Sequence, residues 1–204
     1  MIRSALRVVA LLAIFAGPVT AQTPATPQLP AEHIRGKVKT LDAERLVVAT
    51  REGRTAIVAL TKDWVVVLMK PVDASAIKPG SFIGATEVET PGGGESLEIH
   101  ILPPGARIGE GRYPWDLKPG TTMTCGVVLH AVAGPKGREL DVEYPGGTRH
   151  IFVSPAAPVV ETVPGDRLLL KPGASVFIAP MRTPDGGWAA TRILVGEKGE
   201  APPM

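Results

Sequence analysis

The chain has 204 residues, with 22 Lys and Arg against 20 Asp and Glu, and its single cysteine cannot form an internal disulfide. Two of the basic residues, Arg3 and Arg7, lie at the extreme N-terminus, so the remaining chain has 20 basic and 20 acidic residues. Nucleic acid and anionic membrane surfaces are therefore excluded as expected partners, because a phosphate-rich partner needs an excess of positive charge.

Residues 1–21 have the features of a secretory signal peptide. Arg3 and Arg7 precede the apolar run at residues 8–16, and Val19, Thr20 and Ala21 supply the small residues of a cleavage site. A nine-residue helix is about 14 Å long and cannot span a hydrocarbon core. We therefore predict cleavage after Ala21, a periplasmic mature protein and no transmembrane segment within it.

The rest of the chain contains an internal repeat. The Lys78-Pro79-Gly80 turn reappears 93 residues later as Lys171-Pro172-Gly173, and a Gly-x-Val segment opens both units, at Gly36 and at Gly126. A fixed offset across several landmarks indicates duplication. The predicted parts are a Pro-rich tether (22–32), module 1 (33–102), a linker (103–121), module 2 (122–196) and a flexible tail (197–204).

Each module is predicted to consist of short strands. Residues 140–144 alternate apolar and polar residues before the turn that contains Gly146 and Gly147, and the chain then returns along residues 149–153. A turn centred on these two glycines places Glu143 opposite His150. Gly80 and Gly173 are assigned as turn residues in the Lys-Pro-Gly segments.

Asp73 and Asp166 are favourable N-caps for one helical turn before each Lys-Pro-Gly segment. Five or six strands with one short helix after the third are typical of a small Greek-key barrel. The predicted fold is mainly β, with two tandem barrels like those that bind oligonucleotides and oligosaccharides (OB-like), each with one short helical turn.

The linker contains Tyr113 and Trp115, which are unusual in a plain connection. Burial of rings this large stabilises a fold, so the first interpretation is an anchor between the two barrels. The second interpretation is an exposed platform on which a ligand stacks, and it makes Tyr113 and Trp115 the candidate ligand-binding residues.

This arrangement resembles a family of exported proteins of Gram-negative bacteria, built from repeated small β-barrel modules that are classed as domains of unknown function. The resemblance covers the whole mature chain and implies the fold and the export, but it implies no catalytic residue. It rests on the two Gly-x-Val openings, on the segments at residues 113–120, 163–166 and 170–174, and on the end at residues 202–204.

No nucleophile elbow and no phosphate-binding loop occur in the sequence. The soft donors Met123 and Cys125, together with His130 and His150, fall in one module and would suit copper. Side chains alternate along a strand, however, so Cys125 and His130 are expected on opposite faces. We therefore expect Cys125 to point into the second barrel as a buried, unreactive thiol.

The sequence favours a non-enzymatic protein of the cell envelope that binds or supports an unknown macromolecule or protein, without a cofactor. Two alternatives remain open at this point. One is a periplasmic protein that handles a metal such as copper, and the other is a hydrolase whose motif is not recognisable.

Overall fold

The computed structural model describes residues 33–204, which form a mainly β protein with thirteen strands and three short 3-10 helices. All thirteen strands belong to one mixed sheet. The predicted signal peptide (1–21) and tether (22–32) lie outside the described residues. Within residues 33–204, no helix is long and apolar enough to cross a membrane.

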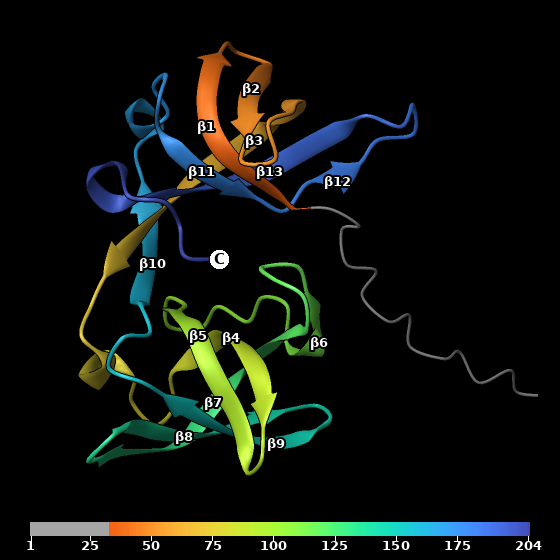
Figure 1. Ribbon diagram of the computed structural model, residues 1–204. Helices are drawn as coiled ribbons and strands as arrows, with labels where there is room; N and C mark the ends of the chain where they lie inside the picture. Colours follow the sequence, from red (N-terminus) through yellow and green to blue (C-terminus); the bar gives the residue numbers. More distant parts are fainter. Residues whose placement is uncertain (1–32) are drawn as a thin grey trace, which may run out of the picture.

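Five strands from the two ends of the described chain close into a ring, which we call the terminal ring (Figure 1). They pair in the order β13-β11-β1-β2-β3, and β3 pairs back with β13 in parallel. A two-residue strand, β12 (Met181–Arg182), lies on the outer edge of β13. The members are β1 (Ile34–Leu41), β2 (Arg45–Thr50), β3 (Thr55–Pro71), β11 (Ser175–Ile178) and β13 (Trp188–Gly196).

Five strands from the middle of the chain close into a second ring, the central ring. They pair in the order β5-β4-β7-β8-β9, and β9 pairs back with β5 in parallel. A further strand, β6 (Gly111–Trp115), pairs with the first half of β7. The members are β4 (Phe82–Thr90), β5 (Gly93–Ile101), β7 (Thr121–Gly134), β8 (Gly137–Tyr144) and β9 (Gly147–Val153).

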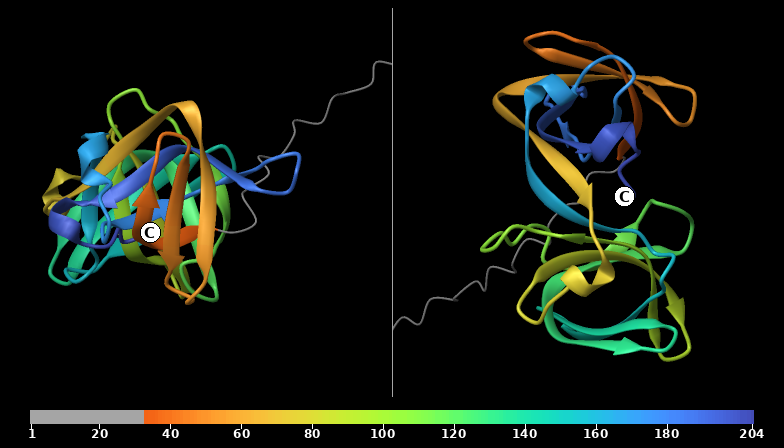
Figure 2. Two further views of the ribbon diagram at one scale, coloured as in Figure 1. Left: turned by 90° about the horizontal axis from the view of Figure 1, so that it is seen from above. Right: turned by 90° about the vertical axis from the view of Figure 1, so that its left-hand side faces the viewer.

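The two rings are joined by the long strand β3 and by β10 (Val159–Gly165). These strands pair with each other in antiparallel register, and β10 also pairs in parallel with β5 (Figures 1 and 2). A 3-10 helix follows each joining strand: η1 (Ala74–Ala76) follows β3 and η2 (Arg167–Leu169) follows β10. The third, η3 (Glu197–Gly199), follows β13 and leads into the C-terminal residues.

This pairing differs from the arrangement expected from the two sequence units. Strands β1, β2 and β3 of the first unit pair with β11 and β13 of the second, while β4 and β5 of the first unit pair with β7, β8 and β9. The physical reason lies in β3, whose 17 residues contain no glycine and extend over about 55 Å. A strand of this length carries the chain of the first unit away from its own ring, and β10 carries the second unit across beside it, so the last two strands of each unit complete the ring of the other.

The repeated landmarks contact each other across the two units. In the central ring, the amide of Gly80 donates to the carbonyl of Val128 at 2.8 Å, and the amide of Val128 donates to Ser81 at 2.9 Å. In the terminal ring, Gly173 donates to Val38 at 2.8 Å, and Val38 donates to the carbonyl of Ala174 at 2.9 Å. Each Lys-Pro-Gly turn is therefore bonded to the Gly-x-Val segment of the other unit.

The glycine of each Gly-x-Val segment allows close approach of a neighbouring strand. A β-carbon at Gly36 would lie 2.1 Å from the carbonyl oxygen of Ala49, and one at Gly126 would lie 2.1 Å from that of Glu143. Real atoms do not approach so closely, so a side chain at either position would push two paired strands apart.

Three apolar clusters stabilise the structure. One fills the terminal ring and includes Leu46 and Val48, and another fills the central ring and includes Ile99 and Leu140. The third lies between the rings and contains residues of both, and we call it the junction cluster. Its buried members are Met69, Phe82, Leu102, Met123, Cys125, Val160, Phe177 and Met204.

Two local predictions can be compared directly with the structure. Asp73 and Asp166 cap the two 3-10 helices, with their side chains accepting from the amides of Ser75 and Leu168. The predicted register of the β8–β9 hairpin is wrong by two residues on β9, since Glu143 pairs with Thr148 and His150 pairs with Asp141. The loop is therefore formed by residues 145 and 146, because Gly147, with φ of +134°, already pairs as the first residue of β9.

Because the two units exchange strands, we expect the two halves of the chain to stay associated when the connection between them is cut. A protease site inserted after the exposed Gly105 and then cleaved should give two fragments that elute together in size-exclusion chromatography. Both rings contain strands from both fragments, so neither fragment can complete a ring alone. Two fragments that elute separately would contradict this pairing, and the uncut insertion variant is the control.

Candidate functional site at the junction of the rings

Trp115 lies at the end of β6, between the two rings. Its ring centroid is 4.2 Å from that of His33 and 6.1 Å from that of Phe177, a residue of β11 in the terminal ring. Tyr113 lies on the same side of β6, with its centroid 6.2 Å from Trp115. Both aromatic residues are partly buried against the junction cluster, so Trp115 is packed against the neighbouring ring rather than standing free in solvent.

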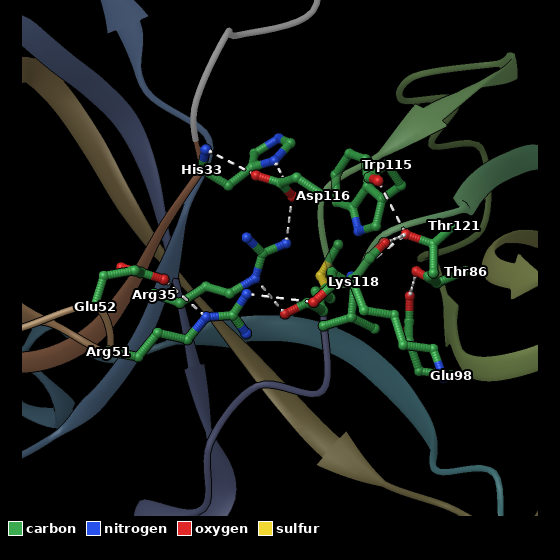
Figure 3. A network of polar contacts seen from close by, with 12 residues as sticks. His33, Arg35, Arg51, Glu52, Thr86, Glu98, Trp115, Asp116, Lys118 and Thr121 are labelled. Carbon is green, nitrogen blue, oxygen red and sulfur yellow. Dashed lines mark hydrogen bonds and ion pairs between the residues drawn. The ribbon is translucent and has the colours of Figure 1, made fainter.

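An ion pair next to Trp115 joins the rings (Figure 3). Arg35 of β1 donates from Nη2 to the Asp116 carboxylate at 2.7 Å and from Nε to the main-chain oxygen of Met204 at 2.7 Å. His33 approaches the same carboxylate through Nδ1 at 2.7 Å. Arg35 also lies over the ring of Phe177, 5.0 Å from its centroid. The start of β1, the strand β6 and the C-terminal residues are thus fixed together.

These contacts shift the ionisation of both partners. Burial alone would raise the pKa of Asp116, but hydrogen bonds from Arg35 and His33 hold that pKa well below its usual range. Burial lowers the pKa of His33 below 6.5, against the opposing effect of Asp116. The junction therefore favours a charged carboxylate and a neutral imidazole.

A second polar group lies on the face of the central ring that turns toward the junction. Glu98 is fully buried, accepts from the hydroxyl of Thr86 through Oε1, and lies 3.3 Å from Nδ1 of His100 through Oε2. Gly84 lies between His100 and Cys125 in the ladder, because it pairs with both. The missing side chain at Gly84 leaves room for the His100 ring.

Cys125 is buried, but it does not point into the second barrel as predicted. Val128 packs in the central ring, whereas Cys125 packs on the opposite face in the junction cluster. Burial raises the pKa of the Cys125 thiol to about 11, with a smaller opposing effect from the hydroxyl of Tyr113, 3.5 Å from Sγ. The environment therefore favours the neutral thiol over the nucleophilic thiolate.

The four predicted metal candidates are not brought together. Met123 and Cys125 share the junction cluster, whereas His130 and His150 lie exposed on the outside of the central ring. Both histidines contact Asp141, at 3.5 Å and 2.9 Å. In the part of the chain that the structure describes, no three His, Cys, Asp or Glu side chains are placed to hold a metal ion.

A third polar group surrounds Glu87 of β4. Glu87 is fully buried and accepts hydrogen bonds from Thr124 at 2.9 Å and from Arg112 and Arg149, each at 3.1 Å. Glu89 bonds to the same two arginines. A buried carboxylate needs such partners to remain in the fold, so we interpret this group as structural.

A groove with a volume of about 500 Å³ lies where the end of β3, η1, the start of β8 and the C-terminal residues meet. Arg138 lines it, and its Nη2 donates to the carbonyl of Ile77 at 3.1 Å. The Nε of Arg138 is buried and has no hydrogen-bond partner among residues 33–204. The acidic residues Asp73, Glu197 and Glu200 also line the groove, so it offers both signs of charge beside an apolar wall.

Comparisons with known proteins give no match: no family model, no curated protein and no solved structure matches this chain. The function must therefore be argued from the residues themselves.

The sequence shows that Glu98 and His100 are close to each other, but it does not show that they lie near Cys125. The two residues are separated by one position, which places them on the same face of a strand. Their proximity to Cys125 depends on β4 pairing with β7 of the other unit, and no local pattern predicts that pairing.

Acidification is predicted to destabilise the protein through His33. Because its pKa is lowered in the fold, the unfolded chain binds the proton more readily, and stability is lost as the pH falls below 6.5. One proton gives a slope of at most about 1.4 kcal/mol per pH unit. Urea unfolding between pH 7.5 and 5 should therefore show a smaller slope for His33→Gln than for the wild type. Equal slopes would contradict this assignment.

Labelling of Cys125 is predicted to be slow in the native protein. The raised pKa reduces the thiolate population by roughly a hundredfold at pH 8, and burial hinders the reagent further. A maleimide or disulfide reagent should react quickly only after denaturation. Equal rates in native buffer and in guanidinium would show that the thiol is accessible.

Proposed function

We propose that the chain is an exported, non-enzymatic binding or scaffold protein of the bacterial cell envelope, built from two OB-like barrels that exchange strands. Each ring has five strands. Numbered by position in the repeat, they are β1, β2, β3, β11 and β13 in the terminal ring and β7, β8, β9, β4 and β5 in the central ring, and in both rings the third and fifth strands pair in parallel. A short 3-10 helix precedes the fourth strand of each ring, at η1 and η2. These features support the barrel assignment, because an OB-like barrel is a five-stranded Greek-key arrangement.

The proposed location in the periplasm rests on the sequence of residues 1–21, with its basic start, apolar run and small residues before Ala21. The balanced charge of the remaining chain favours a partner other than nucleic acid. A macromolecule or protein of the envelope fits both observations.

The observation that carries the proposed binding role is the groove beside Arg138. Its volume lies within the range of ligand-binding sites, and Arg138 lines it together with apolar residues. The guanidinium of Arg138 belongs to the lining, so an acceptor oxygen of a bound ligand can form a charge-assisted hydrogen bond there. Backbone carbonyls of a peptide and hydroxyls or carboxylates of a glycan both supply such an acceptor.

The chemistry of the described residues favours binding over catalysis. A nucleophile needs a base within hydrogen-bond distance, and the hydrogen-bond partner of the Cys125 thiol is the Tyr113 hydroxyl. Its raised pKa also opposes thiolate formation. A hydrolase therefore has no specific support in the geometry.

The test is to fill the groove and to measure what is bound. Ala156 lines the groove and is exposed, so Ala156→Arg should block it without entering an apolar cluster. Wild-type protein purified natively from the periplasm should carry a bound peptide, glycan or protein detectable by mass spectrometry. We expect Ala156→Arg to reduce that material at least tenfold.

The matched control is Ala43→Arg, the same substitution in the exposed turn between β1 and β2. This variant should retain the bound material at the wild-type level. Equal amounts in the wild type and Ala156→Arg would place the binding surface elsewhere, and wild-type protein without bound material would contradict the proposal.

A further inference from the structure

Sulfur side chains gather at the junction of the rings. The chain has five methionines and one cysteine, and four of these six residues belong to the junction cluster. Such a gathering provides soft donor atoms in a dry, apolar environment. The four are Met69, Met123, Cys125 and Met204.

His100 adds a nitrogen donor to this corner. A β-carbon built on Gly84 would lie 2.2 Å from Nε2 of His100 and 3.2 Å from Sγ of Cys125, so both atoms line the same small space above Gly84. His100 is only 7% exposed, and its other ring nitrogen, Nδ1, lies 3.3 Å from the Glu98 carboxylate. The imidazole therefore places Nε2 in the same small space that the Cys125 thiol lines.

The Glu98 carboxylate fixes the orientation of the His100 ring. Its Nδ1 lies 3.3 Å from Oε2 of Glu98, and Thr86 donates to the other oxygen of that carboxylate. When Nδ1–H donates to Glu98, Nε2 keeps its lone pair free. Histidines that bind metals are commonly held by a carboxylate in this way.

We propose that His100 Nε2 and Cys125 Sγ, with the Met123 thioether on the same face of β7, form a binding site for Cu(I). Thiolate, thioether and imidazole donors select this ion over hard divalent cations. Binding replaces the thiol proton with the metal: the S–H bond is lost, an S–Cu bond forms and one proton leaves, with no change of oxidation state. The inference is independent of the proposed groove.

Charge and donor number favour Cu(I) over Zn²⁺ at this place. A thiolate with Cu(I) and a neutral imidazole carries no net charge, which suits an apolar junction where an unpaired charge is costly. Structural Zn²⁺ sites take four strong ligands, whereas two strong donors face this space.

The test is an anaerobic titration of the reduced full-length mature protein with Cu(I), in competition with a chromogenic Cu(I) chelator. We expect one Cu(I) per chain and a sulfur–nitrogen environment in X-ray absorption spectra. Cys125→Ser should abolish binding, and His100→Gln should weaken it. Glu98→Gln, which acts through His100, should reduce the affinity roughly ten- to hundredfold.

His150→Gln is the matched control, because this histidine lies exposed on the outer face of the central ring. It should bind Cu(I) like the wild type. Circular dichroism and urea unfolding of the metal-free variants establish that each one folds, and Met123→Leu provides a conservative variant if Cys125→Ser does not. Binding that survives in both Cys125→Ser and Met123→Leu, or that is lost in His150→Gln, would overturn the proposed site.

Discussion

Each Lys-Pro-Gly turn is hydrogen-bonded to the Gly-x-Val segment of the other repeat, and the rest of the structure depends on this reciprocal contact. Gly80 and Val128 bond in one ring, and Gly173 and Val38 bond in the other. In the same Gly-x-Val segments, Gly36 and Gly126 allow the paired strands β2 and β8 to approach, because a β-carbon would collide with the carbonyl of Ala49 or Glu143. Because the bonds cross between repeats, the repeats are halves of two shared rings, and the junction cluster can form between them.

Much of the local structure could be predicted from the sequence, whereas the pairing of its elements could not. Alternating residues predicted the β8–β9 hairpin, and Asp73 and Asp166 predicted the two capped helical turns. A strand has the same apolar pattern whether its partner belongs to its own repeat or to the other one. The length of β3 is the one local signal of exchange, since 17 residues without a glycine cannot turn back within one small ring.

For the candidate sites too, the sequence indicated which residues matter, but their neighbours depend on strand pairing. Aromatic composition was sufficient to single out Trp115, and residue type was sufficient to expect a buried Cys125. The face to which Cys125 belongs depends on which side of β7 meets the other ring. The alternation of side chains along the strand does not reveal this, so the sequence prediction placed Cys125 in the core of the central ring instead of the junction cluster. His100 and Glu98 become neighbours of Cys125 only through the empty position at Gly84, which is a property of three paired strands.

Along the sequence, the strands of the central ring lie between the two sets of strands that form the terminal ring, and this order determines when each ring can close during synthesis. Every strand of the central ring has emerged by Val153, so that ring can close while the chain is still incomplete. The terminal ring has to wait, because Ile34 pairs with Ile178 and β3 pairs with β13. Until then β1, β2 and β3 form an open hairpin sheet with free edges, which is the form of a β protein most prone to aggregate. A chain synthesised from its N-terminus therefore exposes these strands first and pairs their free edges last.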